Sequence, residues 1–181
     1  MGRMILGAAS SLDGYWADTL GESVFPPEAS DRNALIDRLV EGCGAVVMNA
    51  PTYERVARCD WYADSYGLRT PLFVVTDGPR RDTGRDERLN LRFVPDFATA
   101  FAEARKIAGE RAVLVVGGNG ALEAAMARDE ADEILLRIVD RNLGHGTRLF
   151  DEPRQIEGYY VSEIKNAPGA VHMRLERRQR A

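Results

Sequence analysis

The sequence predicts an α/β fold with a mixed, mainly parallel central sheet that is flanked by helices on both faces and closes with antiparallel strands. Short apolar runs alternate with segments of helical periodicity over the first two thirds of the chain, as expected where parallel strands are buried on both faces. The last two extended segments, Tyr159 to Ile164 and Val171 to Leu175, flank the turn residues Asn166-Ala167-Pro168-Gly169. This composition predicts an antiparallel hairpin.

The first half of the chain predicts four strands and two helices. A helix from about Asp31 to Glu41 is predicted because Ser30 and Asp31 are suitable N-caps and Gly42 is suited to end it. A shorter helix is expected over Thr52 to Ala57, after the turn Asn49-Ala50-Pro51. The strands correspond to short apolar runs, namely Met4 to Ala9, Ala45 to Met48, Pro71 to Thr76 and Leu91 to Val94.

The second half predicts two helices and two strands ahead of the hairpin. Asp96 is suited to cap a helix whose apolar residues fall on one face and which ends at Gly109. The strand Ala112 to Val116 follows, and a helix over Ala121 to Arg128 comes next. The run Ile134 to Val139 makes a further strand before the hairpin.

Length and composition predict a single domain over residues 1–181. The chain is 45% hydrophobic and 29% charged, which suits a globular protein with a sizeable core. Its net charge is -4 and its basic residues are scattered except at the C-terminus, so nucleic-acid binding is not expected. No apolar run reaches the roughly 20 residues of a membrane span, and the start lacks the apolar stretch of a secretory signal. We therefore expect a cytoplasmic protein that binds no membrane.

The few cysteines and histidines argue against disulfide or metal chemistry. Cys43 and Cys59 are the only cysteines, and His145 and His172 are the only histidines. Two thiols do not make a disulfide framework, so both are expected to be reduced. Cys43 stands ahead of an apolar strand, which favours a small buried side chain. No metal site of the usual His/Cys type is expected.

Three loop-like turns follow predicted strands: Ser10 to Gly14, Asn49 to Thr52, and Gly117 to Gly120. In open α/β sheets, ligands lie beyond the carboxyl ends of the strands. The glycine turn Gly117-Gly118-Asn119-Gly120 precedes a helix, where backbone N–H groups and the helix dipole favour phosphate. It matches neither G-x-G-x-x-G nor a lysine-bearing P-loop. A phosphate site and a plain structural turn therefore both remain open.

Six motifs, in this order along nearly the whole chain, resemble the dihydrofolate reductase-like superfamily, and in particular the reductase domain of bacterial riboflavin-biosynthesis deaminase-reductases. They are Ala9-Ser10-Ser11-Leu12-Asp13-Gly14, Asn49-Ala50-Pro51-Thr52-Tyr53-Glu54, Val115-Val116-Gly117-Gly118-Asn119-Gly120, Ala131-Asp132-Glu133-Ile134, Leu143-Gly144-His145-Gly146-Thr147-Arg148-Leu149-Phe150 and Pro168-Gly169-Ala170-Val171-His172-Met173.

The resemblance implies a homodimeric reductase in which a nicotinamide dinucleotide, NADPH or NADH, donates hydride to a small heterocyclic or carbonyl substrate. The glycine turn and the helix start at Ala121 and Leu122 would then hold the pyrophosphate, with Thr52 against it. Asp13 would be the catalytic residue that orients or polarises the substrate, with Ser11 beside it as a second substrate-binding residue. The cofactor-binding positions carried over are Ala9, Asn49, Ala50, Thr52, Thr76, Gly117, Gly118, Asn119, Gly120, Ala121 and Leu122.

Two departures from the family pattern bear on the choice between NADPH and NADH. The second turn usually reads Gly-Arg-x-Thr, in which the arginine meets the 2′-phosphate of NADPH, and here Ala50 takes the arginine's place. The next strand often ends in Ser-Arg or Thr-Arg, whereas Asp77 follows Thr76 here. A carboxylate repels a phosphate instead of pairing with it. Loop arginines such as Arg80, Arg81 and Arg85 would have to restore the positive charge.

A third departure concerns the substrate. The family motif commonly continues Leu-Asp-Gly-Lys, whereas Tyr15 and Trp16 follow Gly14 here, so aromatic surface replaces a cation suited to phosphate. The H-x-E and P-C-x-x-C zinc motifs of a deaminase domain are also absent from the sequence. The chain is therefore expected to be a stand-alone reductase, and the riboflavin substrate itself is not implied.

Other interpretations of these residues stay open. The chain could be a non-catalytic, dimeric nucleotide- or flavin-binding protein that kept the fold, because both expected arginines are missing. Asp13 could be only a turn former, and His145 only a solvated loop residue. The adjacent Asp132 and Glu133 would point to opposite faces of a strand, which favours structural roles. Loop aromatics offer either stacking or packing surface, namely Trp61, Tyr62 and Tyr66.

Overall fold

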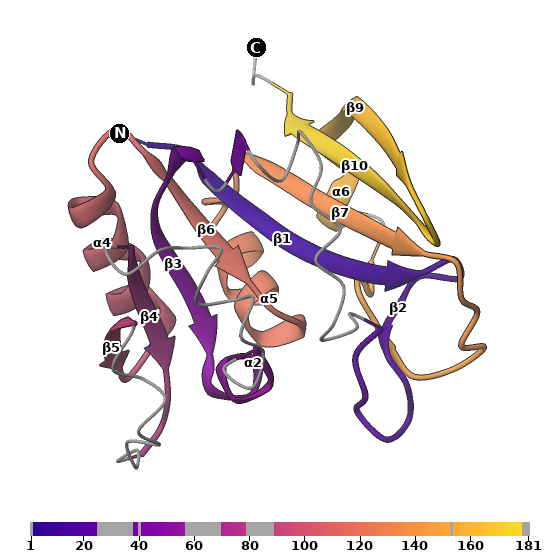
Figure 1. Cartoon of the computed structure of the whole chain (residues 1–181), viewed down its shortest axis with the longest axis horizontal. Helices are drawn as coiled ribbons and strands as arrows, with labels where there is room; N and C mark the ends of the chain where they lie inside the picture. Colours follow the sequence, from indigo (N-terminus) through magenta and orange to yellow (C-terminus); the bar gives the residue numbers. More distant parts are fainter. Residues whose placement is uncertain are drawn as a thin grey trace.

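The computed structural model describes residues 2–24, 38–39, 41–56, 70–78, 89–152 and 154–178. Ten strands are present in these ranges: β1 (Met4–Ser11), β2 (Tyr15–Ala17), β3 (Cys43–Asn49), β4 (Pro71–Val75), β5 (Asn90–Val94), β6 (Ala112–Val116), β7 (Glu133–Val139), β8 (Thr147–Arg148), β9 (Tyr159–Ala167) and β10 (Ala170–Arg177). The labelled helices are α2 (Ala50–Val56), α4 (Phe97–Ala108), α5 (Asn119–Ala127) and α6 (Arg154–Glu157). Figure 1 shows their arrangement.

Eight strands form one sheet in the order β5-β4-β3-β6-β1-β7-β10-β9. The six from β5 to β7 pair in parallel, whereas β10 runs antiparallel to both β7 and β9. The predicted mixed sheet with an antiparallel closing hairpin is therefore confirmed. Because β3, β6 and β1 are adjacent and parallel, their carboxyl ends lie at one edge of the sheet.

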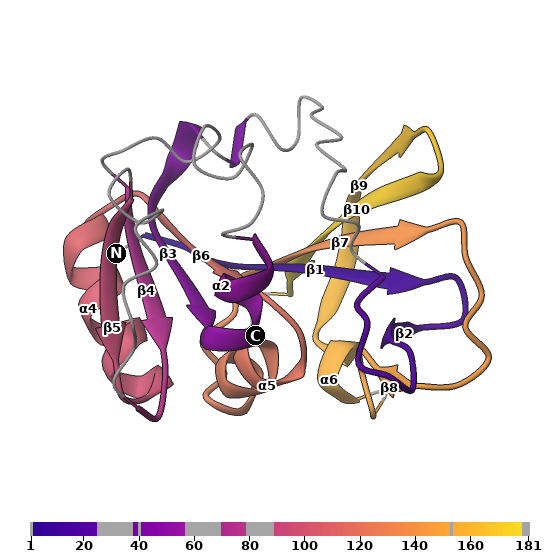
Figure 2. The same ribbon diagram turned by 60° about the horizontal axis from the view of Figure 1, so that its bottom comes forward.

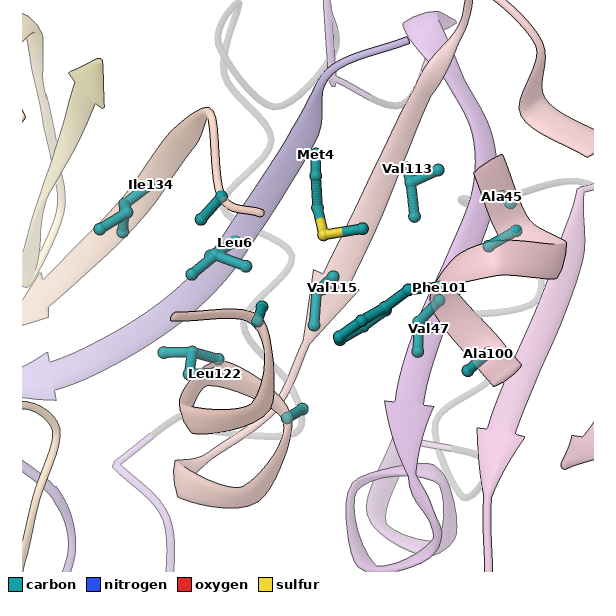
Figure 3. Close-up of a cluster of buried hydrophobic side chains, with 14 of the residues drawn as sticks. Met4, Leu6, Ala45, Val47, Ala100, Phe101, Val113, Val115, Leu122 and Ile134 are labelled. Carbon is teal, nitrogen blue, oxygen red and sulfur yellow. The ribbon is translucent and has the colours of Figure 1, made fainter. Parts of the chain in front are cut away.

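Two layers of apolar side chains cover the two faces of this sheet. On one face, Phe101 of α4 and Leu122 of α5 pack against alternate residues of the central strands, as Figure 3 shows. On the other face, Tyr53 of α2 is fully buried in a second cluster. That second cluster takes the intervening strand residues, for example Val46, Met48, Leu72 and Leu114. Strand periodicity thus divides each apolar run between two cores.

Helix α4 has the termini that the sequence predicts. The Asp96 carboxylate accepts a hydrogen bond of 2.8 Å from the N–H of Thr99, as an N-cap should. Gly109 at the C-terminal end has a φ of 63°, which glycine adopts without the strain that a Cβ brings. Phe101 and Ala104 are buried on the predicted face.

Two helices begin two residues earlier than predicted. Helix α2 starts at Ala50 instead of Thr52, because Asn49 serves as its cap: Asn49 Oδ1 accepts a bond of 3.0 Å from the Thr52 N–H. Pro51 needs no partner there, since it has no N–H. Helix α5 starts at Asn119 instead of Ala121, with Gly118 in the N-cap position.

Smaller differences concern short or terminal segments. The sequence reading missed the two-stranded sheet of β2 and β8 and the single turn of α6. The final hairpin is longer than predicted, so only Pro168 and Gly169 remain as its turn. Of the helix predicted from Asp31 to Glu41, only Arg38, Leu39 and Glu41 are described as helical, and Gly42 continues the helix instead of ending it. The remainder of that prediction lies outside the described residues.

No helix among the described residues is long and apolar enough to cross a membrane.

Candidate functional site

Two of the three turns predicted to form a site, Asn49 to Thr52 and Gly117 to Gly120, meet at the carboxyl edge of the sheet, whereas the turn Ser10 to Gly14 contacts the loop after β7. Helices α2 and α5 lie side by side beyond the ends of β3 and β6 (Figure 1 and Figure 2). Close approaches link the turns: a Cβ placed on Gly117 would lie 2.8 Å from Thr52 Oγ1, and one on Gly120 would lie 3.5 Å from Asn49 Nδ2. The turn after β3 therefore packs directly against the glycine turn after β6, and we call residues Gly117–Gly120 with Thr52 the cradle.

Gly117 can only be glycine for two reasons. Its φ of 143° lies in a region that L-residues rarely adopt. The Thr52 hydroxyl also occupies the place where a side chain would start. The structure thus places Thr52 against the turn, which is where the family resemblance puts it.

Trp16 lies over the next residue of the cradle. A Cβ on Gly118 would lie 2.1 Å from Trp16 Cε2 and 2.6 Å from Nε1, so the indole is in direct contact with the backbone of Gly118. The glycine at 118 is therefore explained by contact within the chain. Sequence reasoning identified Trp16 only as a departure from the family's lysine and did not place it on the glycine turn.

The start of α5 offers three backbone donors. The first helical bond runs from the Leu122 N–H to the Gly118 carbonyl at 3.4 Å, so the N–H groups of Asn119, Gly120 and Ala121 precede it and have no partner within the helix. No side-chain hydrogen bond caps Gly118. These donors, together with the helix dipole, suit an anion.

Leu122 does not belong with these donors, because its own N–H is used in the helix and its side chain is buried in the core. Ala121 has no exposed side-chain surface either. The predicted helix start at Ala121 and Leu122 is thus wrong by two residues. Glycine's low helix propensity favoured the later start, whereas the N-cap geometry at Gly118 sets the earlier one.

Asp13 is fixed by the loop around it. Its carboxylate accepts bonds from the Ser11 hydroxyl at 2.6 Å, the Gly144 N–H at 2.6 Å and the Leu143 N–H at 3.1 Å. The Ser11 bond first, and the Gly144 and Leu143 bonds after it, lower the pKa of Asp13 to about 2. A carboxylate that stays ionised cannot act as a general acid near neutral pH. The three hydrogen bonds give Asp13 a structural role in joining the two loops. They are also compatible with a role in orienting a substrate or stabilising positive charge.

Ser11 is fully buried and serves the same structure. While its hydroxyl donates to Asp13, its oxygen accepts a bond of 2.9 Å from the Tyr15 N–H. The hydroxyl is therefore occupied on both sides, and the loop after β1 is joined through Asp13 to the loop after β7. His145, the next residue along the chain, is exposed beside Gly144, whose N–H is held by Asp13.

The other carried-over positions differ in how far they reach the site. Ala9 is buried in a small apolar cluster with Val24 and Val139. Ala50 packs against the second core, and the Thr76 N–H is bonded to the Val94 carbonyl at 3.0 Å. Asp77 is exposed beyond β4. The arginines and aromatics considered for this edge lie outside the described residues: Arg80, Arg81, Arg85, Trp61, Tyr62 and Tyr66.

The carboxylates of the fourth motif have structural roles, as predicted. Asp132 Oδ2 accepts a bond of 2.7 Å from the Met4 N–H. Glu133 is buried and accepts two bonds from Arg174, at 2.7 and 2.8 Å, and one from Arg3 at 3.2 Å. These contacts join the N-terminus, β7 and β10.

Neither thiol nor metal chemistry is indicated in the part of the chain that the structure describes. Cys43 is buried, as predicted, and burial raises the pKa of its thiol to about 11. His172 is packed within β10 and pairs across the sheet with Arg137. No group of three or more His, Cys, Asp or Glu side chains is arranged to hold a metal in those ranges. Cys59 lies outside them.

Comparison with known proteins finds relatives by structure only. No family model and no curated protein matches the sequence. A solved structure from Shewanella sp. PV-4, of a protein named for riboflavin biosynthesis, superimposes with a TM-score of 0.73 and 21% identity, covering 98% of this chain and 99% of that one.

A second solved structure, from Thermotoga maritima, is a diaminohydroxyphosphoribosylaminopyrimidine deaminase/5-amino-6-(5-phosphoribosylamino)uracil reductase. It superimposes with a TM-score of 0.72 and 15% identity over 97% of this chain, which spans only 56% of that longer protein. At this level of identity the likeness concerns the fold. The sheet order, the closing antiparallel hairpin and the superposition on these two neighbours together identify a dihydrofolate reductase-like fold.

Proposed function

We propose that this chain is a reductase that uses a nicotinamide dinucleotide, NADPH or NADH, to reduce a small heterocyclic or carbonyl substrate. The observation that carries the proposal is the contact of Thr52 with Gly117, directly ahead of the start of α5, at the carboxyl edge of a dihydrofolate reductase-like sheet. One structural neighbour is named as a reductase of a phosphoribosylated aminouracil, which supports a heterocyclic substrate here.

The donors in the cradle fit a pyrophosphate. Asn119 and Gly120 supply backbone N–H groups at a helix N-terminus, with Ala121 buried behind them, and the Thr52 hydroxyl lies against Gly117. A reduced nicotinamide, when bound, supplies the hydride. The chain's own residues bind and orient the two reactants and limit the access of water. Asp13, held as a carboxylate, would orient the substrate or stabilise positive charge without donating a proton.

The residues at the family's two arginine positions favour NADH over NADPH. The position at which the family carries an arginine is Ala50, which is partly buried against the second core, and the exposed residue after Thr76 is Asp77. A 2′-phosphate near Asp77 would be repelled. NADH has no such group, so it meets no such penalty.

The test is a thermal-shift titration of the purified protein with NADH, NADPH and FMN. A ligand that binds the folded state at 100 times its Kd stabilises it by about 2.7 kcal/mol, which is about 5–11 °C for a chain of this size. We expect NADH to give the larger shift of the two dinucleotides. No shift with any of the three at millimolar concentration would refute the reductase proposal.

A matched variant checks where the ligand sits. Thr52→Val keeps the side-chain shape and the backbone bond to Asn49 but removes the hydroxyl. A hydrogen bond to a charged group contributes about 1.5–3 kcal/mol, so the dinucleotide Kd should rise about tenfold or more. An unchanged Kd would place the ligand elsewhere.

A second candidate is a non-catalytic protein that binds a nucleotide or flavin. Two observations favour it: Trp16 covers part of the cradle, and Ala50 and Asp77 supply no cation. It predicts saturable binding without oxidation of NADH by any heterocyclic or carbonyl acceptor. A homodimer, which the resemblance implies, stays a prediction that sedimentation would test.

A further inference from the structure

We propose that Trp16 is a movable cover on the cradle, and that a dinucleotide binds there only when the indole leaves Gly118. This inference rests on the proposed function, because it concerns access to the same site. The inference goes beyond the proposed function because it assigns a role to Trp16, a residue that departs from the family pattern.

The indole of Trp16 is in direct contact with the backbone of Gly118. Trp16 Cε2, Cζ2 and Nε1 are the nearest atoms to a Cβ built on Gly118, at 2.1, 2.2 and 2.6 Å. Gly118 is the N-cap of α5, directly ahead of the donors at Asn119 and Gly120. A phosphate bound at those donors must come close to the same surface. The indole and the ligand therefore compete for one place.

Local structure sets the direction of the indole. Tyr15 and Ala17 of β2 pair with Arg148 and Thr147 of β8, and the register shifts between these two pairs, so Trp16 is the extra residue of a bulge in β2. The guanidinium of Arg148 lies 4.7 Å from the centre of the Tyr15 ring, and this contact joins β2 to β8. Bulges re-aim side chains, and the indole of Trp16 meets Gly118 at the start of α5.

The segment that carries Trp16 lies outside the eight-stranded sheet. Strands β2 and β8 form a separate sheet of three and two residues. Additional bonds run from the Val24 N–H to the Trp16 carbonyl at 2.9 Å and from Arg55 to the Gly21 carbonyl at 3.3 Å. Two more anchor the residues just before Trp16, from the Tyr15 N–H to Ser11 Oγ at 2.9 Å and from the Leu149 N–H to the Gly14 carbonyl at 3.0 Å. The indole is only partly buried against the core. Moving it breaks no pairing of the eight-stranded sheet.

The energetic consequence is a lowered apparent affinity. When only a fraction of molecules is competent to bind, the apparent Kd equals the intrinsic Kd divided by that fraction. Removing the cover makes the whole population competent. Trp16→Ala should therefore bind NADH more tightly than the parent, whereas a residue that stacks on the ligand would give weaker binding when truncated.

The experiment uses Trp61→Phe as the parent, since Trp16 and Trp61 are the only tryptophans. With 5-fluorotryptophan incorporated, Trp16 gives the single ¹⁹F signal, and NADH is added while binding is followed by calorimetry. We expect the ¹⁹F signal to move on saturation. The Kd of Trp16→Ala in this background should be at least about threefold lower than that of the parent. The Kd of Trp16→Phe, which keeps a smaller ring, should lie between those of the parent and Trp16→Ala. This variant replaces Trp16→Ala in the test if the alanine variant does not fold.

The outcomes separate the two proposals. If NADH binds but the ¹⁹F signal stays unchanged, or if Trp16→Ala and Trp16→Phe bind no better than the parent, the cover is refuted while the proposed function stands. If only the truncated variants bind, the cover is supported. If no protein binds NADH or NADPH, both proposals fail.

Discussion

Replacing Gly117 by alanine tests the geometry on which the cradle depends. The substitution meets two obstacles, a φ of 143° and a Thr52 Oγ1 atom 2.8 Å from the new Cβ. A sparsely populated backbone conformation costs about 1–3 kcal/mol, and overpacking adds about 1–3 kcal/mol. The free energy of unfolding should therefore fall by about 2–6 kcal/mol, the sum of these two ranges.

Urea denaturation of four proteins separates the two terms: the parent, Gly117→Ala, Thr52→Ala and the double variant. Removing the Thr52 hydroxyl should relieve the overlap and leave the backbone strain. The double variant should thus be more stable than additivity predicts, by about 1 kcal/mol or more. The midpoint should shift with an unchanged m-value. A cost of Gly117→Ala below about 0.5 kcal/mol, within the range of ordinary surface changes, would refute this geometry of the turn, and strict additivity would refute the contact with Thr52.

Three further predictions concern Asp13, the core and the buried thiol. Because the folded-state pKa of Asp13 is lowered to about 2 from 3.8, its stabilising effect should be fully present above about pH 4 and lost as the pH falls through about 2; urea melts of Asp13→Asn should converge with the parent over that window. Phe101→Ala, which empties a 1% exposed site, should cost about 3–5 kcal/mol in the same assay, and a cost under 1 would contradict the packing. In a Cys59→Ser background the Cys43 thiol, with its pKa raised to about 11, should resist iodoacetamide at neutral pH until the protein is unfolded; labelling of the folded protein would show the opposite.

The central strands could be predicted because a strand that is buried on both faces is a continuous run of apolar residues. Strand β6 begins at Ala112 and ends at Val116, as predicted, since its apolar run is bounded by polar residues and glycines. The closing hairpin was recognisable from its turn residues, but its length was not. Residues such as Ser162 and Asn166 are exposed on the edge strand, where no apolar pattern marks the strand ends.

The candidate site was predicted as three turns but not as a set of contacts. Strand order decides which turns are neighbours, and no local pattern encodes that β6 lies between β3 and β1. Strands as short as β2 and β8 carry no measurable periodicity, so the direction of Trp16 could not be read from sequence. The Asp13 anchor likewise depends on N–H groups roughly 130 positions away.

The position of β1 has a consequence for how the protein is made. Strand β1 is synthesised before the other described strands, and it pairs on one side with β6 and on the other with β7, so Met4 lies opposite Val113 and Ile5 opposite Glu133. Strand β1 cannot pair until β6 and β7, which are translated roughly a hundred residues later, are available. Such long-range pairing slows folding. During that interval both of its edges are open to wrong partners. The nascent chain should therefore depend most on chaperones just before β6 and β7 leave the ribosome.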